Sequence, residues 1–227
     1  MENIKKFDVS SFPNSSFSII LGRRRSGKTV LAEDFIRNMC PDCCFLFSGT
    51  DAGFNMISKE NRFNDIGALN DIIQNYTAMN EYNKVADPPN KFKVKTLIVI
   101  DDLVLKLKGK EFNKLQELSV NGRHVAYAPL CLHIMILGQN LTSFPRIVRN
   151  NVDMMIFNNI SSMKELELVM DEFLYITDSS RDGKKIARKL YNDLITKEDF
   201  SFIVVENHKQ NIKTYQDYIR TYVAKLK

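Results

Sequence analysis

A phosphate-binding motif lies near the start of this 227-residue chain. Residues 22–29 read Gly-Arg-Arg-Arg-Ser-Gly-Lys-Thr and match G-x-x-x-x-G-K-[S/T] at every fixed position. Gly22 and Gly27 allow backbone N–H groups to surround a phosphate. Lys28 reaches the outer phosphates, and the Thr29 hydroxyl is a ligand for Mg²⁺. The motif predicts that the chain binds a nucleoside triphosphate.

The variable positions of this motif are Arg23, Arg24, Arg25 and Ser26, and none of them needs a charge. Two interpretations of the arginines stay open. They face a neighbouring subunit or DNA, or they form a solvated basic tip that raises the local affinity for anions. The whole loop is assigned to nucleotide binding, and no catalytic role is given to the arginines.

Two adjacent acids follow a buried apolar run. Residues 97–100 are Leu-Ile-Val-Ile, and Asp101 and Asp102 come directly after them. Two carboxylates at the tip of a buried strand are costly unless a metal ion and a water molecule use them. In phosphoryl transfer Asp101 would support Mg²⁺ and Asp102 would polarise the attacking water. A turn or a helix cap would explain one of the acids, but not both.

Gln139 follows another apolar run, residues 132–137, across Gly138. An amide at the end of a strand beside the acidic one orients water or senses the γ-phosphate. The sequence Gly-Gln-Asn suits a simple turn equally well.

Arg146 and Arg149 precede the apolar segment 152–157. An arginine that reaches a neighbouring subunit's site stabilises the transferring phosphoryl group. Either arginine is a candidate for this role, and either could instead be a surface cation. We expect the catalytic set to be Asp102, Gln139 and one of these two arginines.

Other basic residues are candidates for contacts with a nucleic-acid backbone. Such contacts depend on charge and not on base sequence, and a solvated loop explains the same residues equally well. The candidates are Lys106, Lys108, Lys110, Arg123 and His124.

Hydrophobic periodicity predicts alternating strands and helices and therefore a three-layer α/β fold with a mostly parallel sheet. The expected helices are amphipathic, and one of them is expected to begin with a capping box formed by Ser162 and Glu165. The expected strands are 17–21, 43–47, 96–100, 132–137, 152–157 and 200–205; the expected helices cover 28–39, 69–76, 112–118, 162–173, 186–194 and a closing segment at about 212–225.

Composition excludes several classes of protein. The chain is 44% hydrophobic and 26% charged, close to the average of globular proteins and unlike a disordered chain. Its four cysteines do not form the spaced pairs of a zinc ribbon, and His133 is expected to be a hydrogen-bonded core residue. No apolar run is long enough to span a membrane, and the N-terminus does not read as a secretory signal.

We expect one domain over residues 1–227, with a core at about 17–206, in a reducing cytoplasm. The net charge of +5 permits anionic partners without requiring them.

The order of these motifs resembles that of genome-packaging ATPases of large eukaryotic DNA viruses, the poxvirus-type members of the FtsK/HerA superfamily. The likeness covers about residues 17–159, with a looser similarity at 200–206. It rests on segments 22–29, 96–103, 121–124 and 149–150 and on the strand that ends at Gln139.

This resemblance implies a RecA-like core that uses ATP and Mg²⁺ in a ring, with a hexamer favoured. Such a ring moves double-stranded DNA into a preformed capsid in the host cytoplasm, with capsid or portal-vertex proteins as partners, and can stay with the virion. By similarity Lys28 and Thr29 hold the nucleotide and Mg²⁺, and Asp101 holds the metal. Asp102 acts on the water, Gln139 on the γ-phosphate, and an arginine near Arg149 on the neighbouring site.

Two alternatives come from other classes. A small nucleoside or nucleotide kinase has a similar phosphate loop, and its basic lid would fall on Arg181, Lys184, Lys185 and Arg188. The paired acids followed by a strand-end glutamine favour water as the acceptor instead. A scaffold that binds nucleotide without hydrolysing it would not need the intact set of Lys28, Thr29, Asp101 and Asp102.

Overall fold

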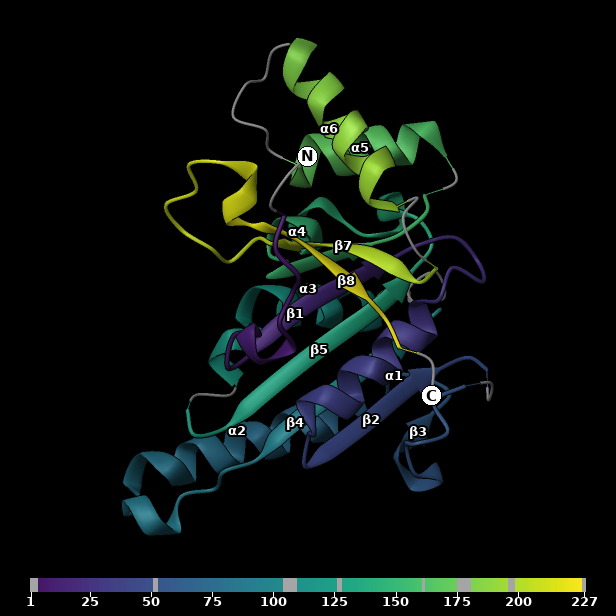
Figure 1. The fold of residues 1–227 in the computed structure, drawn as a ribbon. Helices are drawn as coiled ribbons and strands as arrows, with labels where there is room; N and C mark the ends of the chain where they lie inside the picture. Colours follow the sequence, from purple (N-terminus) through teal and green to yellow (C-terminus); the bar gives the residue numbers. More distant parts are fainter. Residues whose placement is uncertain are drawn as a thin grey trace.

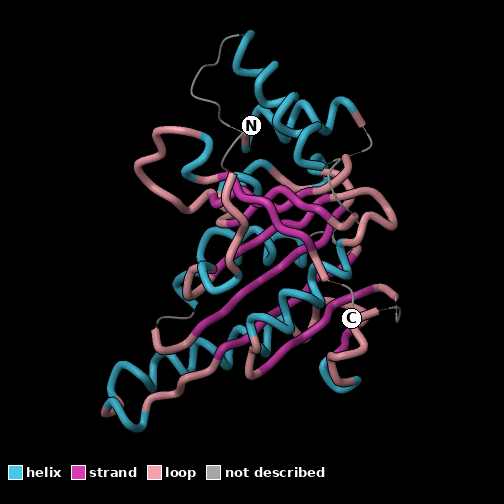
Figure 2. Tube along the Cα trace, viewed as in Figure 1, coloured by secondary structure: helices cyan, strands magenta, loops and turns pink. Residues whose placement is uncertain are grey.

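The computed structural model describes residues 4–50, 53–103, 110–125, 128–160, 162–174, 181–195 and 199–225. Its strands form one eight-stranded sheet in the order β3-β2-β4-β5-β1-β6-β7-β8. Figure 2 shows this sheet in magenta, with helices in cyan on both sides. The strands are β1 (Ser16–Leu21), β2 (Cys43–Ser48), β3 (Arg62–Phe63), β4 (Lys95–Asp101), β5 (Cys131–Gly138), β6 (Met154–Phe157), β7 (Ser201–Glu206) and β8 (Ile219–Val223).

Parallel pairing brings the carboxyl ends of the central strands to one edge of the sheet. Strands β1 to β6 pair in parallel, whereas β7 is antiparallel to both of its neighbours, β6 and β8. Leu21 is in register with Gly138, and Asp101 is in register with both Leu137 and Ser48. The residues that follow β1, β2, β4 and β5 therefore meet at this edge, which is where ligands bind in open α/β sheets.

The helices divide between the two faces of the sheet, so the predicted three-layer α/β architecture is confirmed. Ile20 packs in one core with α1, whereas Ile19 and Leu21 pack in a second core with α2, α3, α5 and α6. In Figure 1 α1 crosses in front of the sheet and α3 lies behind it. The helices are α1 (Lys28–Met39), α2 (Leu69–Val85), α3 (Lys110–Val125), α4 (Arg146–Asn150), α5 (Met163–Phe173) and α6 (Arg181–Ile195).

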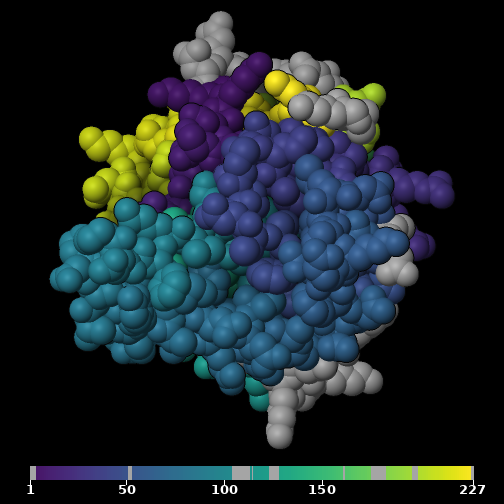
Figure 3. All heavy atoms as spheres, turned by 90° about the horizontal axis from the view of Figure 1, so that it is seen from below, coloured from purple at the N-terminus to yellow at the C-terminus, as the bar shows by residue number. Residues whose placement is uncertain are grey.

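The view from below places α2 on the surface. In Figure 3 α2 and the loop after it, in blue-green to teal, lie beside the blue residues that follow β2. Within the described ranges, no helix combines the length and the apolar character that a bilayer crossing requires.

The predicted closing helix is wrong. Residues Tyr215–Asp217 form a single 3-10 turn, and Ile219–Val223 form β8, antiparallel to β7. The tyrosines and Ile219 recur at intervals of three and four residues, which reads as one helical face. However, Ile219, Thr221 and Val223 are also β-branched and alternate, and pairing with the edge of the sheet decides the outcome.

The predicted capping box at the start of α5 is also wrong. The Ser162 side chain makes no capping hydrogen bond. The Glu165 carboxylate turns instead to the 3-10 turn Leu141–Ser143 and accepts the Leu141 N–H at 2.7 Å and the Thr142 N–H at 3.3 Å. It also accepts the Thr142 hydroxyl. At this turn the buried carboxylate accepts hydrogen bonds from backbone N–H groups that would otherwise have no partner. Such bonds stabilise the fold more than a cap at an exposed helix end would.

His133 is a core residue, as its position on an apolar strand predicts. Its ring is 3% exposed, and Nδ1 lies 2.9 Å from the Ser16 hydroxyl oxygen on the neighbouring strand β1. Burial, with a smaller effect of the Lys95 ammonium, lowers the pKa of His133 to about 4. The imidazole is therefore neutral at pH 7.

Candidate nucleotide-binding site

The predicted phosphate loop joins β1 to α1 with the backbone turns that its glycines permit. Gly27 has a φ of +89° and stands at the N-cap of α1, and Arg25 has a φ of +61°. A Cβ atom on Gly22 would come within 2.4 Å of the Ser26 hydroxyl oxygen, so the loop closes on itself at a point where a side chain has no room. The loop leads directly into a helix N-terminus, where N–H groups and the helix dipole favour an anion.

Hydrogen bonds from two neighbouring strands fix the loop. On the β5 side the Gly22 N–H donates to the Gly138 carbonyl at 3.3 Å. On the β6 side Asn158 Nδ2 donates to the Ser26 carbonyl at 2.9 Å, and the Arg23 N–H donates to the Asn159 carbonyl at 3.2 Å. Sequence reasoning missed Asn158, although a polar side chain directly after a fully apolar strand is a usable signal.

Lys28 is folded back onto its own loop. Its ammonium donates to the Gly22 carbonyl at 2.8 Å and to the Arg23 carbonyl at 3.1 Å, and the residue is 9% exposed. Burial lowers its pKa, while the Asp102 and Asp101 carboxylates raise it. The Lys28 ammonium therefore already interacts electrostatically with the two carboxylates, and a bound phosphate would meet these same charges.

The paired acids lie at the end of β4, as predicted. Burial and the neighbouring Asp102 carboxylate raise the pKa of Asp101 to about 6, against the opposing effect of the Lys28 ammonium. Asp102 is exposed and has a φ of +53°, which aspartate tolerates better than most residues.

These residues line one cavity of about 710 Å³. It brings together the residues predicted from three separate motifs: the phosphate loop, the paired acids and the strand-end glutamine. Thr50 also lines it and was missed; its hydroxyl lies 3.4 Å from that of Ser48, the last residue of the strand beside β4. The lining residues are Arg24, Arg25, Lys28, Thr29, Thr50, Asp101, Asp102 and Gln139.

The donor set in this cavity fits Mg²⁺. The metal takes oxygen ligands, usually one or two from protein side chains, with the rest from phosphates and water. Thr29 and Asp101 both line the cavity and supply a hydroxyl and a carboxylate. A divalent cation there would favour the charged form of Asp101, whose pKa is raised by burial and by the Asp102 carboxylate.

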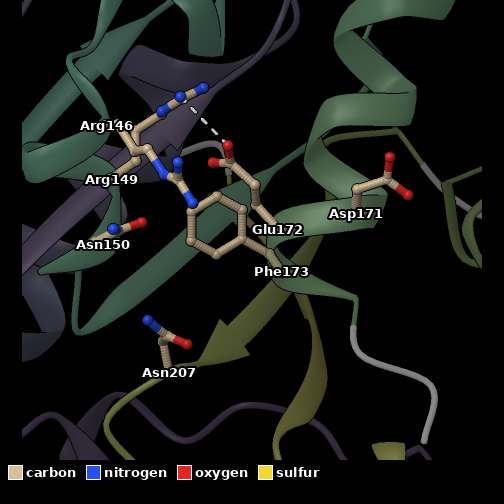
Figure 4. A pocket seen from close by; sticks show the side chains of 7 residues that line it. All are labelled: Arg146, Arg149, Asn150, Asp171, Glu172, Phe173 and Asn207. Carbon is tan, nitrogen blue, oxygen red and sulfur yellow. Dashed lines mark ion pairs between the residues drawn. The ribbon is translucent and has the colours of Figure 1, made fainter. Parts of the chain in front are cut away.

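Arg146 and Arg149 lie in a different cavity, of about 440 Å³. Figure 4 shows the Arg149 guanidinium facing Glu172, while Asp171 points away from the pocket. Arg149 Nη2 lies 3.3 Å from Glu172 Oε1, with the two side chains 13% and 24% exposed. Arg149 Nε and Glu172 Oε2 find no hydrogen-bond partner among the described residues. Neither arginine lines this chain's own phosphate cavity.

The candidate DNA contacts are only partly within the described chain. Lys106 and Lys108 lie outside the described residues. Lys110, Arg123 and His124 lie on α3, and only their backbone is described.

Two of the four basic residues that a kinase lid would use, Lys184 and Arg188, lie on α6 and pair with α5. Lys184 Nζ is 2.8 Å from Asp171 Oδ1, and Arg188 Nη2 is 3.3 Å from Glu167 Oε1. Neither Lys184 nor Arg188 lines the phosphate cavity.

No family model matches the chain. The chain is 24% identical over 210 residues to uncharacterized protein L649 of Acanthamoeba polyphaga mimivirus. This alignment covers 90% of the chain, and the chain spans 64% of the length of that relative.

Solved structures share the fold. The genome packaging NTPase B204 of Sulfolobus turreted icosahedral virus 2 in complex with sulfate has a TM-score of 0.59 at 14% identity, over 95% of this chain and 99% of that chain. The same NTPase in complex with AMPPCP has a TM-score of 0.58 at 16% identity, over 95% and 100%.

The conjugation coupling protein TcpA of pCW3, solved with ATPγS, has a TM-score of 0.55 at 15% identity, over 93% of this chain and 60% of that chain. The chain therefore shares its fold with a viral genome packaging NTPase and with a conjugation coupling protein, which confirms the predicted α/β fold.

Proposed function

We propose that this chain is an ATPase that uses ATP hydrolysis to move double-stranded DNA and package a viral genome into a preformed capsid. The observation that carries the proposal is the cavity in which Lys28, Asp102 and Gln139 meet. A site that binds a triphosphate and directs water at its outer phosphate requires side chains of these three kinds.

The described contacts suggest how the residues divide the work. Lys28 exchanges its bonds to the loop carbonyls for the outer phosphates of ATP, while Thr29 and Asp101 hold Mg²⁺. When bound, the metal neutralises the phosphate charge. Asp102, exposed at the mouth of the cavity, accepts a hydrogen bond from the attacking water, and Gln139 orients that water from the neighbouring strand.

Arg149 acts in a neighbouring subunit's site, with Arg146 as the second candidate. The separation of both residues from their own phosphate cavity supports a role across a subunit boundary. This separation fits a ring in which the next subunit supplies an arginine to each site. We propose a hexamer with capsid or portal-vertex proteins as partners, located in the host cytoplasm or associated with the virion.

DNA is the proposed second substrate. Basic side chains would supply contacts to DNA phosphates that do not read base sequence. The proposed contacts are Lys106, Lys108, Lys110, Arg123 and His124, which follow the paired acids in the chain. The genome packaging NTPase and the conjugation coupling protein that share this fold support this substrate.

Phosphate release with and without long duplex DNA tests the proposal. We expect duplex DNA to stimulate release and Asp102→Asn to abolish nearly all of it. Phosphate transfer that occurs only after a nucleoside acceptor is added would identify a kinase instead. The kinase is the weaker candidate because Lys184 and Arg188 pair with α5 and not with the phosphate cavity.

A further inference from the structure

The aromatic ring of Phe200 lies directly against the phosphate loop. A Cβ atom on Gly27 would come within 2.3 Å of Phe200 Cδ1. Phe200 has a φ of +57°, in the left-handed region that a bulky residue rarely adopts. Backbone strain of this kind persists only where the surrounding structure enforces it, and it concentrates at functional sites.

The strand order places this ring on the side of the loop opposite the paired acids. The loop follows β1, Asp101 ends β4 two strands away on one side, and Phe200 precedes β7 two strands away on the other. Because β7 runs antiparallel to β6, it begins at the edge where β6 ends. The acids, the loop and the ring therefore lie in this order along one edge of the sheet.

A bound nucleoside triphosphate has to span this edge. Its outer phosphates belong near Lys28 and the carboxylates, so its base lies toward the other end of the loop. Phe200 lies at that end, is partly exposed, and packs against the α1 core, as Val30 and Tyr222 also do. An apolar aromatic face beside a phosphate loop suits a nucleobase, which stacks through its π face.

The loop that the ring contacts is held by the neighbouring strand end. Asn158 Nδ2 donates to the Ser26 carbonyl at 2.9 Å, and the Arg23 N–H donates to the Asn159 carbonyl at 3.2 Å. A stacking surface set against a loop fixed in this way binds with little cost of ordering it first.

We propose that Phe200 is the platform on which the base of the bound nucleotide stacks. The inference rests on the proposed function, since it assumes that a nucleoside triphosphate occupies the phosphate loop. Stacking on a ring holds any base and favours the larger purines, so Phe200 supplies affinity for the base and not recognition of adenine by hydrogen bonds.

The test separates the base from the phosphates. Equilibrium binding of Mg·ATP and of Mg·tripolyphosphate, which has the phosphates without the nucleoside, is measured for the wild type, Phe200→Ala and Phe200→Leu. We expect Phe200→Ala to weaken ATP binding roughly tenfold, the order of one lost base–aromatic stack, and to leave tripolyphosphate binding within about twofold. Phe200→Leu keeps apolar bulk without the aromatic face, so it should give a smaller loss for ATP alone.

Phe12→Ala is the matched control for lost packing, because Phe12 belongs to the same core cluster but contacts Phe7 and Phe35 instead of the loop. It should leave both affinities unchanged. Unchanged ATP binding in Phe200→Ala would overturn the proposal, and so would an equal loss for ATP and tripolyphosphate, which would mean that the ring only supports the loop. Failure of the wild type to bind Mg·ATP would instead refute the proposed function.

Discussion

Arg149 Nη2 lies 3.3 Å from Glu172 Oε1, and this ion pair joins α4 to α5 beside a cavity that shares no lining residue with the phosphate cavity. Each of the two side chains leaves one buried polar atom unsatisfied. These atoms are Arg149 Nε and Glu172 Oε2, and neither has a hydrogen-bond partner within the described chain. An arginine proposed to act in another subunit is thus held by a single carboxylate contact in its own.

Removing the carboxylate should destabilise the protein. Glu172→Ala leaves the largely buried Arg149 guanidinium without its ion-pair partner, which we expect to lower the free energy of unfolding by about 1–3 kcal/mol. Asp171→Ala is the matched control, because its pair with Lys184 is exposed and such pairs contribute little. Urea denaturation measures both variants, and equal effects would show that the Arg149–Glu172 pair is no more important than a surface pair.

Mixing two inactive variants should restore activity. Arg149→Ala removes the proposed trans-acting arginine, and Lys28→Ala removes the phosphate contact, so rings of either variant should lose roughly 10³-fold or more in turnover. A mixed ring contains interfaces with an intact Lys28 on one subunit and an intact Arg149 on the next.

The rate of phosphate release from mixtures measures this complementation. We expect mixed samples to exceed the sum of the separate samples. The control is a mixture of Arg149→Ala with the Lys28→Ala, Arg149→Ala double variant, which offers no complete interface. A mixture of the two single variants that is as inactive as its components would refute a shared site.

The Glu165 carboxylate should matter more than the Ser162 hydroxyl. Glu165→Ala leaves the Leu141 and Thr142 N–H groups without their acceptor, and we expect a loss of about 1–3 kcal/mol in the free energy of unfolding. Ser162→Ala should cost far less, since that side chain makes no capping bond. Chemical denaturation compares the two variants, and a larger loss of stability in Ser162→Ala would show that the capping box forms after all.

Stability should fall in acid partly because of His133. Burial lowers the pKa of His133 to about 4, whereas the unfolded chain takes up this proton near pH 6.5. The contribution is therefore complete above pH 6.5 and is lost as the pH falls toward 4, by about 3 kcal/mol at 1.4 kcal/mol per pKa unit. His133→Asn keeps a hydrogen-bonding side chain beside Ser16 but does not titrate. Unfolding measured from pH 7 to pH 4 should thus show a shallower decline in the variant; parallel curves would contradict this origin.

The sequence predicts the central strands and the phosphate cavity because each depends on local signals. Asp101 and Gln139 follow apolar runs, and parallel pairing alone brings such strand ends together. Glu165 and residues 219–223 were misassigned because their roles depend on distant partners. Glu165 satisfies a turn that lies 24 residues away in the chain, and β8 exists only because β7 offers it an edge.

Glu172 and Phe200 gave no signal for the same reason. A glutamate on an amphipathic helix reads as solvated until α4 places Arg149 opposite it. A phenylalanine at the start of an apolar strand reads as core until the fold sets its ring on Gly27.

The claim that Lys28 and the Asp101–Asp102 pair act on one magnesium-bound triphosphate is tested most directly by measuring binding and turnover on the same samples. Mg·ATPγS affinity and the rate of phosphate release from ATP are determined for the wild type, Lys28→Ala and Asp102→Asn. We expect Lys28→Ala to weaken binding at least about tenfold, and Asp102→Asn to bind within about threefold of the wild type while its turnover falls roughly 100-fold or more. Wild-type turnover in Asp102→Asn, or wild-type affinity in Lys28→Ala, would contradict the account.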